Sequence, residues 1–129
     1  MRWMLRSKIH KAVVTGADVK YIGSIAIDQD LIEKTGLWTG EKVLVVSNTT
    51  GARLETYVIS APSGSGTVTM NGAAAHLIKA GEEIIVMGFE LSDKPISPAS
   101  ILVNSKNRFL KFLSSSEDHL SKEKEPGLI

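Results

Sequence analysis

The chain has 129 residues, 43% of them hydrophobic, which suits one domain with a single core. Its 15 Lys and Arg residues nearly balance its 14 Asp and Glu residues, and only 5% of its residues are aromatic. Nucleic-acid-binding proteins usually show a basic excess and aromatic side chains for stacking, so we expect no nucleic-acid partner.

The chain contains no cysteine, which excludes disulfide bonds, thiolate metal sites and a cysteine nucleophile. Residues 1–6 are basic but lack the apolar run of a signal peptide. No stretch reaches the roughly 18 apolar residues that a membrane span needs. We therefore expect a cytoplasmic protein without a membrane partner.

Hydrophobic patterning predicts a chain made mostly of strands, separated by turns rich in Gly, Asn and Ser. In chain order we expect strands at Leu5–Val14 and Ser24–Ile27, a helix at Gln29–Thr35, strands at Val43–Val46, Arg53–Ala61 and Thr67–Met70, a short helix at Ala73–Lys79, strands at Ile84–Leu91 and Ile101–Val103, and a hairpin around Asn104–Asn107. Because Val43–Val46 is apolar without a break, we expect that strand to be buried on both faces.

The first helix has clear end signals. Asp28 is a suitable N-cap, and Gly36 follows the last helical residue, where glycine commonly ends a helix. From Ser114 onward the chain is polar and charged, and it cannot bury enough apolar surface to order itself. We therefore predict a disordered tail at 113–129.

One pattern occurs twice. Residues 35–46 and residues 79–87 each run from a short helix through Gly-Glu into an apolar strand. Two such units suggest a small pseudo-two-fold β-barrel, which leaves no open strand edge. Gly-Glu before an aliphatic run also occurs by chance, so the repeat alone does not decide the architecture.

Several polar residues stand among the apolar strands. Lys8 and His10 share one face of the first strand, and Arg53, Thr56 and Tyr57 lie in an otherwise apolar strand. Each has an ordinary structural reading. A lysine in a strand is commonly solvated, an arginine in a hairpin commonly pairs across strands, and a tyrosine in a strand commonly belongs to the core.

For Arg53, the expected cross-strand partners are Glu41 and Glu55. The three histidines are His10, His76 and His119, and their scattered spacing makes no metal site. Asn71 begins a turn rich in Gly and Ala, whose small side chains let a ligand approach the backbone.

Four motifs in order and at compatible spacing resemble the bacterial aspartate 1-decarboxylase family. They are Met4–His10, Tyr21–Asp28, Arg53–Tyr57 and Asn71–Ala75. The resemblance runs without a gap from about Met1 to Leu91, and more loosely to about Phe112. It implies a six-stranded double-psi β-barrel with short helices over residues 1–112, assembled as a homotetramer with active sites between neighbouring subunits.

The resemblance also implies an activity. The family converts L-aspartate to β-alanine and CO₂ for pantothenate and coenzyme A synthesis. Its members are proenzymes, so we expect self-cutting between Gly23 and Ser24 into residues 1–23 and 24–129. Ser24 then becomes a covalent pyruvoyl cofactor, whose ketone forms a Schiff base with the substrate and accepts the electrons left by CO₂.

The chemistry of cutting needs a hydroxyl against the preceding carbonyl. Ser24 supplies it, while Gly23 leaves that carbonyl unhindered and allows a strained backbone. By resemblance, Thr56 donates a hydrogen bond to the Gly23 carbonyl, and Tyr57 returns a proton to the substrate after decarboxylation.

Aspartate carries two carboxylates, so its site needs cationic groups. Arg53 can bind one carboxylate with two hydrogen bonds, and Lys8 can act as a point charge. The resemblance adds further residues to the site: Thr56, Gly72, Ala73 and Ala74 in contact with substrate, and Asn71, Tyr21 and His10 in support. No metal is expected.

Strand alternation places Arg53 and Tyr57 on one face and Thr56 on the other. Either a bulge re-aims one side chain, or the strand lies at a subunit boundary where both faces border a site. Two other functions stay open: an uncleaved binding module that uses its 72–75 turn, and an RNA-binding barrel. A chain that stays uncut would favour the module, or a proenzyme that needs a maturation factor.

Overall fold

The computed structural model describes residues 1–113. The strands are β1 (Arg2–Val13), β2 (Gly16–Asp18), β3 (Ser24–Asp28), β4 (Lys42–Ser47), β5 (Arg53–Ala61), β6 (Val68–Asn71), β7 (Glu83–Ser92), β8 (Ala99–Val103) and β9 (Phe109–Phe112). They are joined by one α-helix, α1 (Gln29–Thr35), and one 3₁₀-helix, η1 (Gly72–His76), in this part of the chain. None of its helices is long and apolar enough to cross a membrane.

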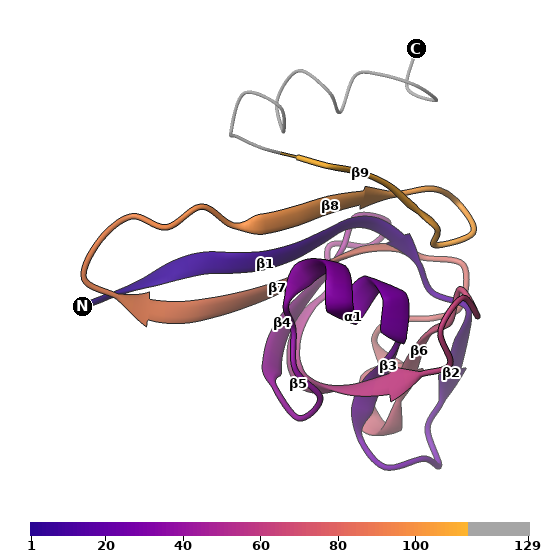
Figure 1. The fold of residues 1–129 in the computed structure, drawn as a ribbon. Coiled ribbons are helices and arrows are strands. Elements are labelled where there is room, and N and C mark those ends of the chain that lie inside the picture. The colour runs from indigo at the N-terminus through magenta and orange to yellow at the C-terminus, as the bar shows by residue number, and fades with distance from the viewer. Residues whose placement is uncertain (114–129) are drawn as a thin grey trace.

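The nine strands form one mixed sheet in the order β2-β6-β3-β5-β4-β7-β1-β8-β9, which confirms the mainly β class. Strand β1 pairs antiparallel with β7 and parallel with β8. In Figure 1, β1, β7 and β8 run together as an extended layer, with the N-terminus at its far end. Strand β9 lies beside β8 at the edge of this layer, while β2, β3, β4, β5 and β6 curve around the rounded part of the molecule, beside α1.

Helix α1 begins and ends where its sequence signals predict. The carboxylate of Asp28 accepts the N–H of Asp30 at 2.9 Å, and also the N–H groups of Gly64 at 3.0 Å and Gly66 at 2.8 Å. Gly36 ends the helix with a left-handed φ of 74° and donates its N–H to Ile32. Asp28 therefore does more than cap the helix, because it also fixes the loop before β6.

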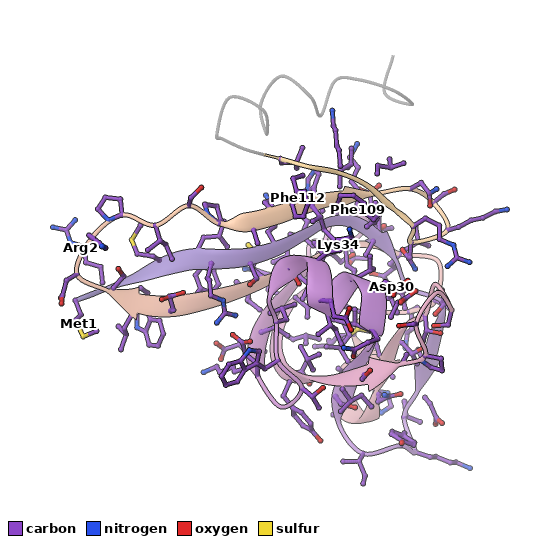
Figure 2. The ribbon with its side chains drawn as sticks, in the orientation of Figure 1. Met1, Arg2, Asp30, Lys34, Phe109 and Phe112 are labelled. Atoms are coloured by element: carbon purple, nitrogen blue, oxygen red, sulfur yellow. The ribbon has the colours of Figure 1, made fainter. Side chains whose placement is uncertain are left out.

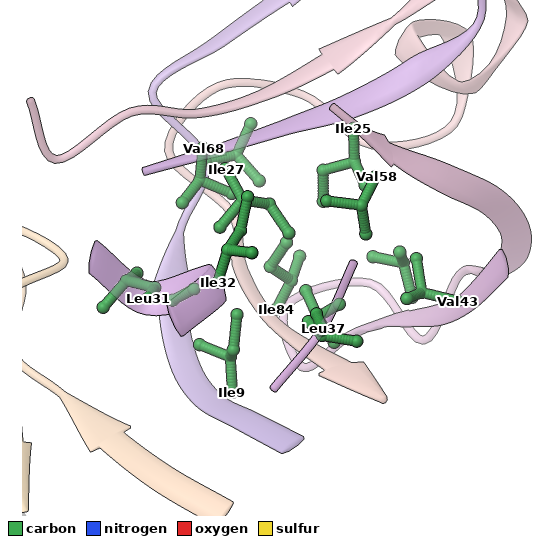
Figure 3. Close-up of a cluster of buried hydrophobic side chains, with 14 of the residues drawn as sticks. Ile9, Ile25, Ile27, Leu31, Ile32, Leu37, Val43, Val58, Val68 and Ile84 are labelled. Carbon is green, nitrogen blue, oxygen red and sulfur yellow. The ribbon is translucent and has the colours of Figure 1, made fainter. Parts of the chain in front are cut away.

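The core gathers aliphatic side chains from α1, β1, β3, β5 and β7. Figure 3 shows Ile9, Ile25, Ile27, Leu31 and Ile84 in this cluster, and all five are at most 1% exposed. Burying such side chains stabilises the fold by about 1.5–3 kcal/mol each. The cluster explains why burial alternates along β4 and the first part of β7, because only one face of these strands can reach it.

Strand β4 corrects one prediction. The apolar run Val43–Val46 is not buried on both faces: Val43 and Val45 are buried, while Leu44 and Val46 are only partly covered. The outward side of Leu44 borders a hollow of about 550 Å³ that is also lined by Trp3 and Phe89. The unbroken apolar run of β4 therefore reflects two apolar faces, one in the core and one at the surface.

The repeated unit is confirmed in three dimensions. Strands β4 and β7 pair antiparallel, with Val45 opposite Val86 and the pairs Leu44–Met87 and Val46–Ile85 on either side of it. Gly40 and Gly81 precede the two strands with φ of 89° and 92°. The two glutamates that follow accept the N–H of the residue three places earlier, Glu41 from Trp38 at 2.9 Å and Glu82 from Lys79 at 2.8 Å. The two units are thus related by a local two-fold axis.

The second unit differs from the first in its helix. The predicted helix at Ala73–Lys79 is instead a 3₁₀-helix over Gly72–His76. Leu77 and Ile78 both donate their N–H groups to the carbonyl of Ala74, so the turn tightens and stops. The strand before it also starts and ends one residue later than expected, at Val68–Asn71.

Strand β9 is anchored to α1 by side chains. The Lys34 ammonium lies 4.5 Å from the centre of the Phe109 ring, and that ring packs edge-on against Phe112 at 5.1 Å (Figure 2). The predicted disordered tail at 113–129 lies outside the described residues except for Leu113. Leu113 is buried and donates its N–H to Ser100 at 2.7 Å.

In the second repeated unit, the carboxylate of Glu82 is buried and accepts hydrogen bonds. It is 7% exposed, and Ser47 Oγ donates to it at 2.6 Å. The hydrogen bond from Ser47, followed by that from the Lys79 amide, holds the pKa of Glu82 below its ordinary value, although desolvation acts in the opposite direction. The ionised form of Glu82 therefore stabilises the fold.

We expect Glu82→Gln to lower the free energy of unfolding by on the order of 1–2 kcal/mol near pH 7, because a charged acceptor forms the stronger hydrogen bonds. The folded-state pKa lies below the unfolded one. The stabilisation is therefore present above pH 4.5, the ordinary value, and is lost as the pH falls through the folded-state value. Urea denaturation in a Ser24→Ala background, where self-cutting is excluded, should show the difference shrinking in acid.

Glu90→Gln is the matched control. Glu90 forms no hydrogen bond or ion pair with any described residue, so its substitution should change the unfolding free energy little at any pH. A Glu82→Gln effect that stayed constant from neutral to acidic pH would contradict the assignment.

Candidate active site

The candidate site is built on the end of β6. Asn71, the last residue of that strand, pairs with Asp18 of β2 on one side and with Ser24 of β3 on the other. Residues 19–23 connect these two partners, and we call this segment the arch. Its first turn is held by Asp18, whose carboxylate accepts the Lys20 N–H at 2.9 Å and whose carbonyl accepts the Tyr21 N–H at 3.3 Å.

Ser24 closes the arch with a buried side chain that is 1% exposed. Its hydroxyl donates to the carbonyl of Ile22 at 3.0 Å and accepts a hydrogen bond from Asn71 Nδ2 at 3.1 Å. A hydroxyl has one proton and two lone pairs, so one lone pair remains free of these two bonds. The oxygen is thus held in a defined position next to the Gly23–Ser24 peptide bond.

Gly72 lies against the arch. Its φ is +72°, and a Cβ at this position would lie 2.6 Å from Gly23 Cα, 2.8 Å from Gly23 N and 3.2 Å from the carbonyl oxygen of Tyr21. Gly23 itself lies outside the left-handed region, and its own Cβ position is open. Gly23 therefore shows no left-handed strain in the uncut chain, and the residue whose conformation and close contacts require glycine is Gly72.

Strand β5 brings Tyr57 and Thr56 to the same end of the sheet. It runs parallel to β3 with Ile25 opposite Val58. Continued backward, this register puts Tyr57 level with Ser24 and Thr56 level with Gly23. Tyr57 faces outward and is 37% exposed, whereas Thr56 is half-buried on the opposite face. The Thr56 hydroxyl forms no hydrogen bond with the residues that the structure describes, so the expected bond to the Gly23 carbonyl is not made here.

Arg53 lies away from Ser24 within one chain. It precedes Tyr57 by four residues, or about 13 Å along an extended strand. The pairing of β5 with β3 and β4 has no register shift, so the bulge considered above is absent. The ordinary reading of Arg53 is also wrong, because Glu41 pairs with Arg6 and Glu55 pairs with Lys42 at 3.4 Å.

Lys8 and His10 share β1, as predicted, but this strand pairs with β7 and β8 and not with β3 or β6. Lys8 is half-buried opposite Met87, and His10 is 4% exposed opposite Leu102. Both residues have interactions within the protein. A single chain therefore does not bring either cation, Lys8 or Arg53, to Ser24 along its sheet.

The remaining predicted residues surround the arch. Tyr21 is 55% exposed on the arch itself, Asn71 is buried beneath it, and η1 presents Ala73 to solvent and Ala74 half-buried. Ser24 lines none of three hollows of about 380–550 Å³ that lie elsewhere on the described surface. Within residues 1–113, no three acidic or histidine side chains group together as metal ligands.

Two contributors to the site were not identified from the sequence. Asp18 folds the start of the arch, because its carboxylate accepts the N–H of Lys20, two residues further on. This is an Asx-turn, which an aspartate at the start of a loop commonly forms. The carbonyl of Ile22 accepts the Ser24 proton, and no sequence pattern marks a main-chain acceptor of this kind. The buried Ser24 hydroxyl is therefore held beside the peptide bond of the exposed residue Gly23. This hydroxyl can act as an internal nucleophile.

A sequence model of the aspartate decarboxylase family matches residues 1–110. The chain is similar to aspartate 1-decarboxylase of Neisseria meningitidis, with 44% identity over 92% of this chain and 96% of the relative. It is 48% identical to aspartate 1-decarboxylase 1 of Frankia casuarinae over 85% of this chain and 74% of the relative. It is 44% identical to aspartate 1-decarboxylase of Chloroherpeton thalassium over 93% and 91%.

We expect Gly23→Ala to leave the stability of the uncut chain unchanged or slightly higher. Its Cβ position is open and its backbone is not left-handed, and a compatible Gly→Ala change typically stabilises by about 0.4–1 kcal/mol. Thermal unfolding of Ser24→Ala with and without Gly23→Ala measures the effect. A loss of more than about 1 kcal/mol would show that Gly23 needs its glycine backbone after all.

Proposed function

The chain belongs to the aspartate decarboxylase family, and we propose that it removes the α-carboxylate of L-aspartate with a pyruvoyl group made from Ser24. It is an aspartate 1-decarboxylase, an enzyme of the lyase class. The observation that carries the proposed mechanism is the Ser24 hydroxyl, buried and held by Asn71 at the end of the arch.

The cutting step follows from the atoms in place. Ser24 Oγ bonds to the carbonyl carbon of Gly23, and the proton passes to the Ser24 nitrogen as the C–N bond breaks, which leaves an ester. Loss of the Ser24 α-proton then breaks the Cβ–Oγ bond and releases residues 1–23 with a terminal carboxylate. Water replaces the nitrogen, ammonia leaves, and a ketone remains at position 24. The burial of Ser24 fits a group made from its own side chain, because the hydroxyl is held in one position beside the carbonyl that it attacks.

The pyruvoyl group supplies a ketone that reacts with the substrate amine and takes up the electron pair left by CO₂. The chain's own residues supply the rest. Tyr57 is level with Ser24 on an exposed part of β5, so its hydroxyl can deliver a proton to a substrate held at position 24. Thr56 is assigned to the Gly23 carbonyl during cutting, and its hydroxyl is free of other described partners.

Substrate recognition is shared between subunits in this proposal. Aspartate brings two carboxylates. Of the cations assigned to them, Arg53 lies four residues along β5 from the position level with Ser24, and Lys8 lies on β1, which does not pair with β3. A neighbouring subunit of a homotetramer would bring its own Arg53 and Lys8 to the pyruvoyl group. The backbone of Gly72, Ala73 and Ala74 would contact the substrate from the subunit that carries Ser24.

The finer fold and the setting are also proposals. The two-fold relation between the repeated units supports a six-stranded double-psi β-barrel at the centre of the molecule. The product β-alanine would feed pantothenate and coenzyme A synthesis in the cytoplasm. In the uncut chain the Ser24 proton is held by the carbonyl of Ile22. A maturation factor that breaks this hydrogen bond would speed cutting.

Purified protein should separate into two chains split between Gly23 and Ser24, because the hydroxyl and the peptide bond are already adjacent. Intact-mass measurement gives the two masses, with the larger one lower by the mass of one ammonia than a chain that begins with an ordinary Ser24. Ser24→Ala should stay full-length and release no CO₂ from aspartate. A wild-type chain that stays whole after long incubation, alone and with cell extract, would favour the uncleaved binding module.

Arg53→Ala should cut normally yet lose at least about 100-fold in kcat/KM for aspartate, because a bidentate contact to a carboxylate is removed. Decarboxylation can be followed by CO₂ release. Arg2→Ala, at an exposed arginine on the far end of β1, is the control and should keep normal activity. Normal activity in Arg53→Ala would contradict the assignment.

Mixing tests the sharing of sites. Arg53→Ala and Ser24→Ala are each expected to be inactive, but co-expression should restore part of the activity if one subunit supplies Ser24 and its neighbour supplies Arg53. No recovery in assemblies shown to contain both chains would place the two residues in the same subunit's site.

A further inference from the structure

We propose that Gly72 is a positioning residue for self-cutting, which seats the arch so that the Gly23 carbonyl carbon meets the Ser24 hydroxyl. This inference rests on the self-cutting proposed above and concerns a residue outside the bond that is cut. It assigns to Gly72 a role before any substrate binds, distinct from the backbone contact to substrate already proposed.

The topology forces the arch over Gly72. Strands β2 and β3 lie on the two sides of β6, so the ends of the arch are about 10 Å apart. Both ends are tied to Asn71 by strand pairing, at Asp18 and at Ser24. The next residue along the chain after Asn71 is Gly72. The arch must therefore cross the place where β6 continues into η1.

The contact between the arch and Gly72 is made of backbone on both sides. The atoms nearest to a Cβ at Gly72 are Gly23 Cα and Gly23 N, at 2.6 and 2.8 Å. Real Cβ contacts of this length essentially never occur, and no side-chain rotation could relieve one. Any side chain at position 72 would push Gly23 away, and Gly23 carries the carbonyl that is attacked.

The two reacting atoms are held by two consecutive residues. Asn71 holds the nucleophile, because its Nδ2 donates to Ser24 Oγ at 3.1 Å. Gly72 sets the position of the electrophile, because Gly23 rests on it. Lifting Gly23 while Asn71 still holds Ser24 would separate the oxygen from the carbon. A misplacement of about 1 Å can cost about 100-fold in rate.

The test compares two glycines with the same backbone conformation. Gly72→Ala and Gly36→Ala both place a Cβ at a left-handed φ, +72° and +74°, but the Cβ position at Gly36 has no atom within 4 Å. Both variants therefore carry similar backbone strain, and only Gly72→Ala clashes with the arch. The full-length variants are followed by intact mass against time after purification.

We expect Gly36→Ala to cut at the wild-type rate and Gly72→Ala to cut about 100-fold more slowly or not at all. Hydroxylamine, which splits esters, should release no fragments from Gly72→Ala, because the step that fails is formation of the new C–O bond. Cutting of Gly72→Ala within a few-fold of wild type would overturn the proposal. A wild-type chain that never cuts would overturn both this inference and the function on which it rests.

A second variant covers the case in which Gly72→Ala does not fold. One glycine inserted between Val19 and Lys20 lengthens the arch at exposed residues and leaves Gly72 unchanged. A longer arch is no longer pressed onto Gly72, so cutting should slow while the thermal unfolding temperature of the uncut chain stays near that of Ser24→Ala. If the chain with the lengthened arch cut at the wild-type rate, the proposed positioning role of Gly72 would be wrong.

Discussion

The double pairing of Asn71 is the constraint on which the site depends. One residue at the end of β6 has β2 on one side and β3 on the other, and this fixes both ends of residues 19–23. The side chain of the same residue then holds the Ser24 hydroxyl at 3.1 Å. The short connection between β2 and β3, which are not neighbours in the sheet, thereby ends in a peptide bond that has a hydroxyl nucleophile beside it. The accuracy of the site comes from the strand pairing at both ends of the arch.

The sheet also decides which groups one chain can gather. Neighbouring strands β6, β3 and β5 bring Asn71, Ser24 and Tyr57 to one end, since register fixes residues on adjacent strands at the same level. Arg53 is displaced along β5, and Lys8 sits on a strand that pairs elsewhere. A dicarboxylate substrate needs those charges. The proposal that a second copy of the chain completes the site accounts for both charges.

Local sequence signals predicted much of the fold. The ends of α1 follow from Asp28 and Gly36, and the repeated Gly-Glu units proved to share one two-fold axis between Val45 and Val86. The requirement for glycine at position 72 could not be predicted in this way, because it arises from a backbone contact between segments far apart in sequence. The exposed side of β4 was missed for a similar reason, as burial depends on what covers a strand and not only on its own residues.

The position of β1 within the sheet has a consequence for the protein after cutting. Residues 1–23 include β1, which lies between β7 and β8, and β2, which pairs with β6. The severed piece would thus remain inside the structure, held by non-covalent pairing alone. Refolding of the cut protein would require two chains to meet, so its recovery from denaturation would depend on concentration. The cut that forms the cofactor would therefore also prevent the enzyme from refolding as a single chain.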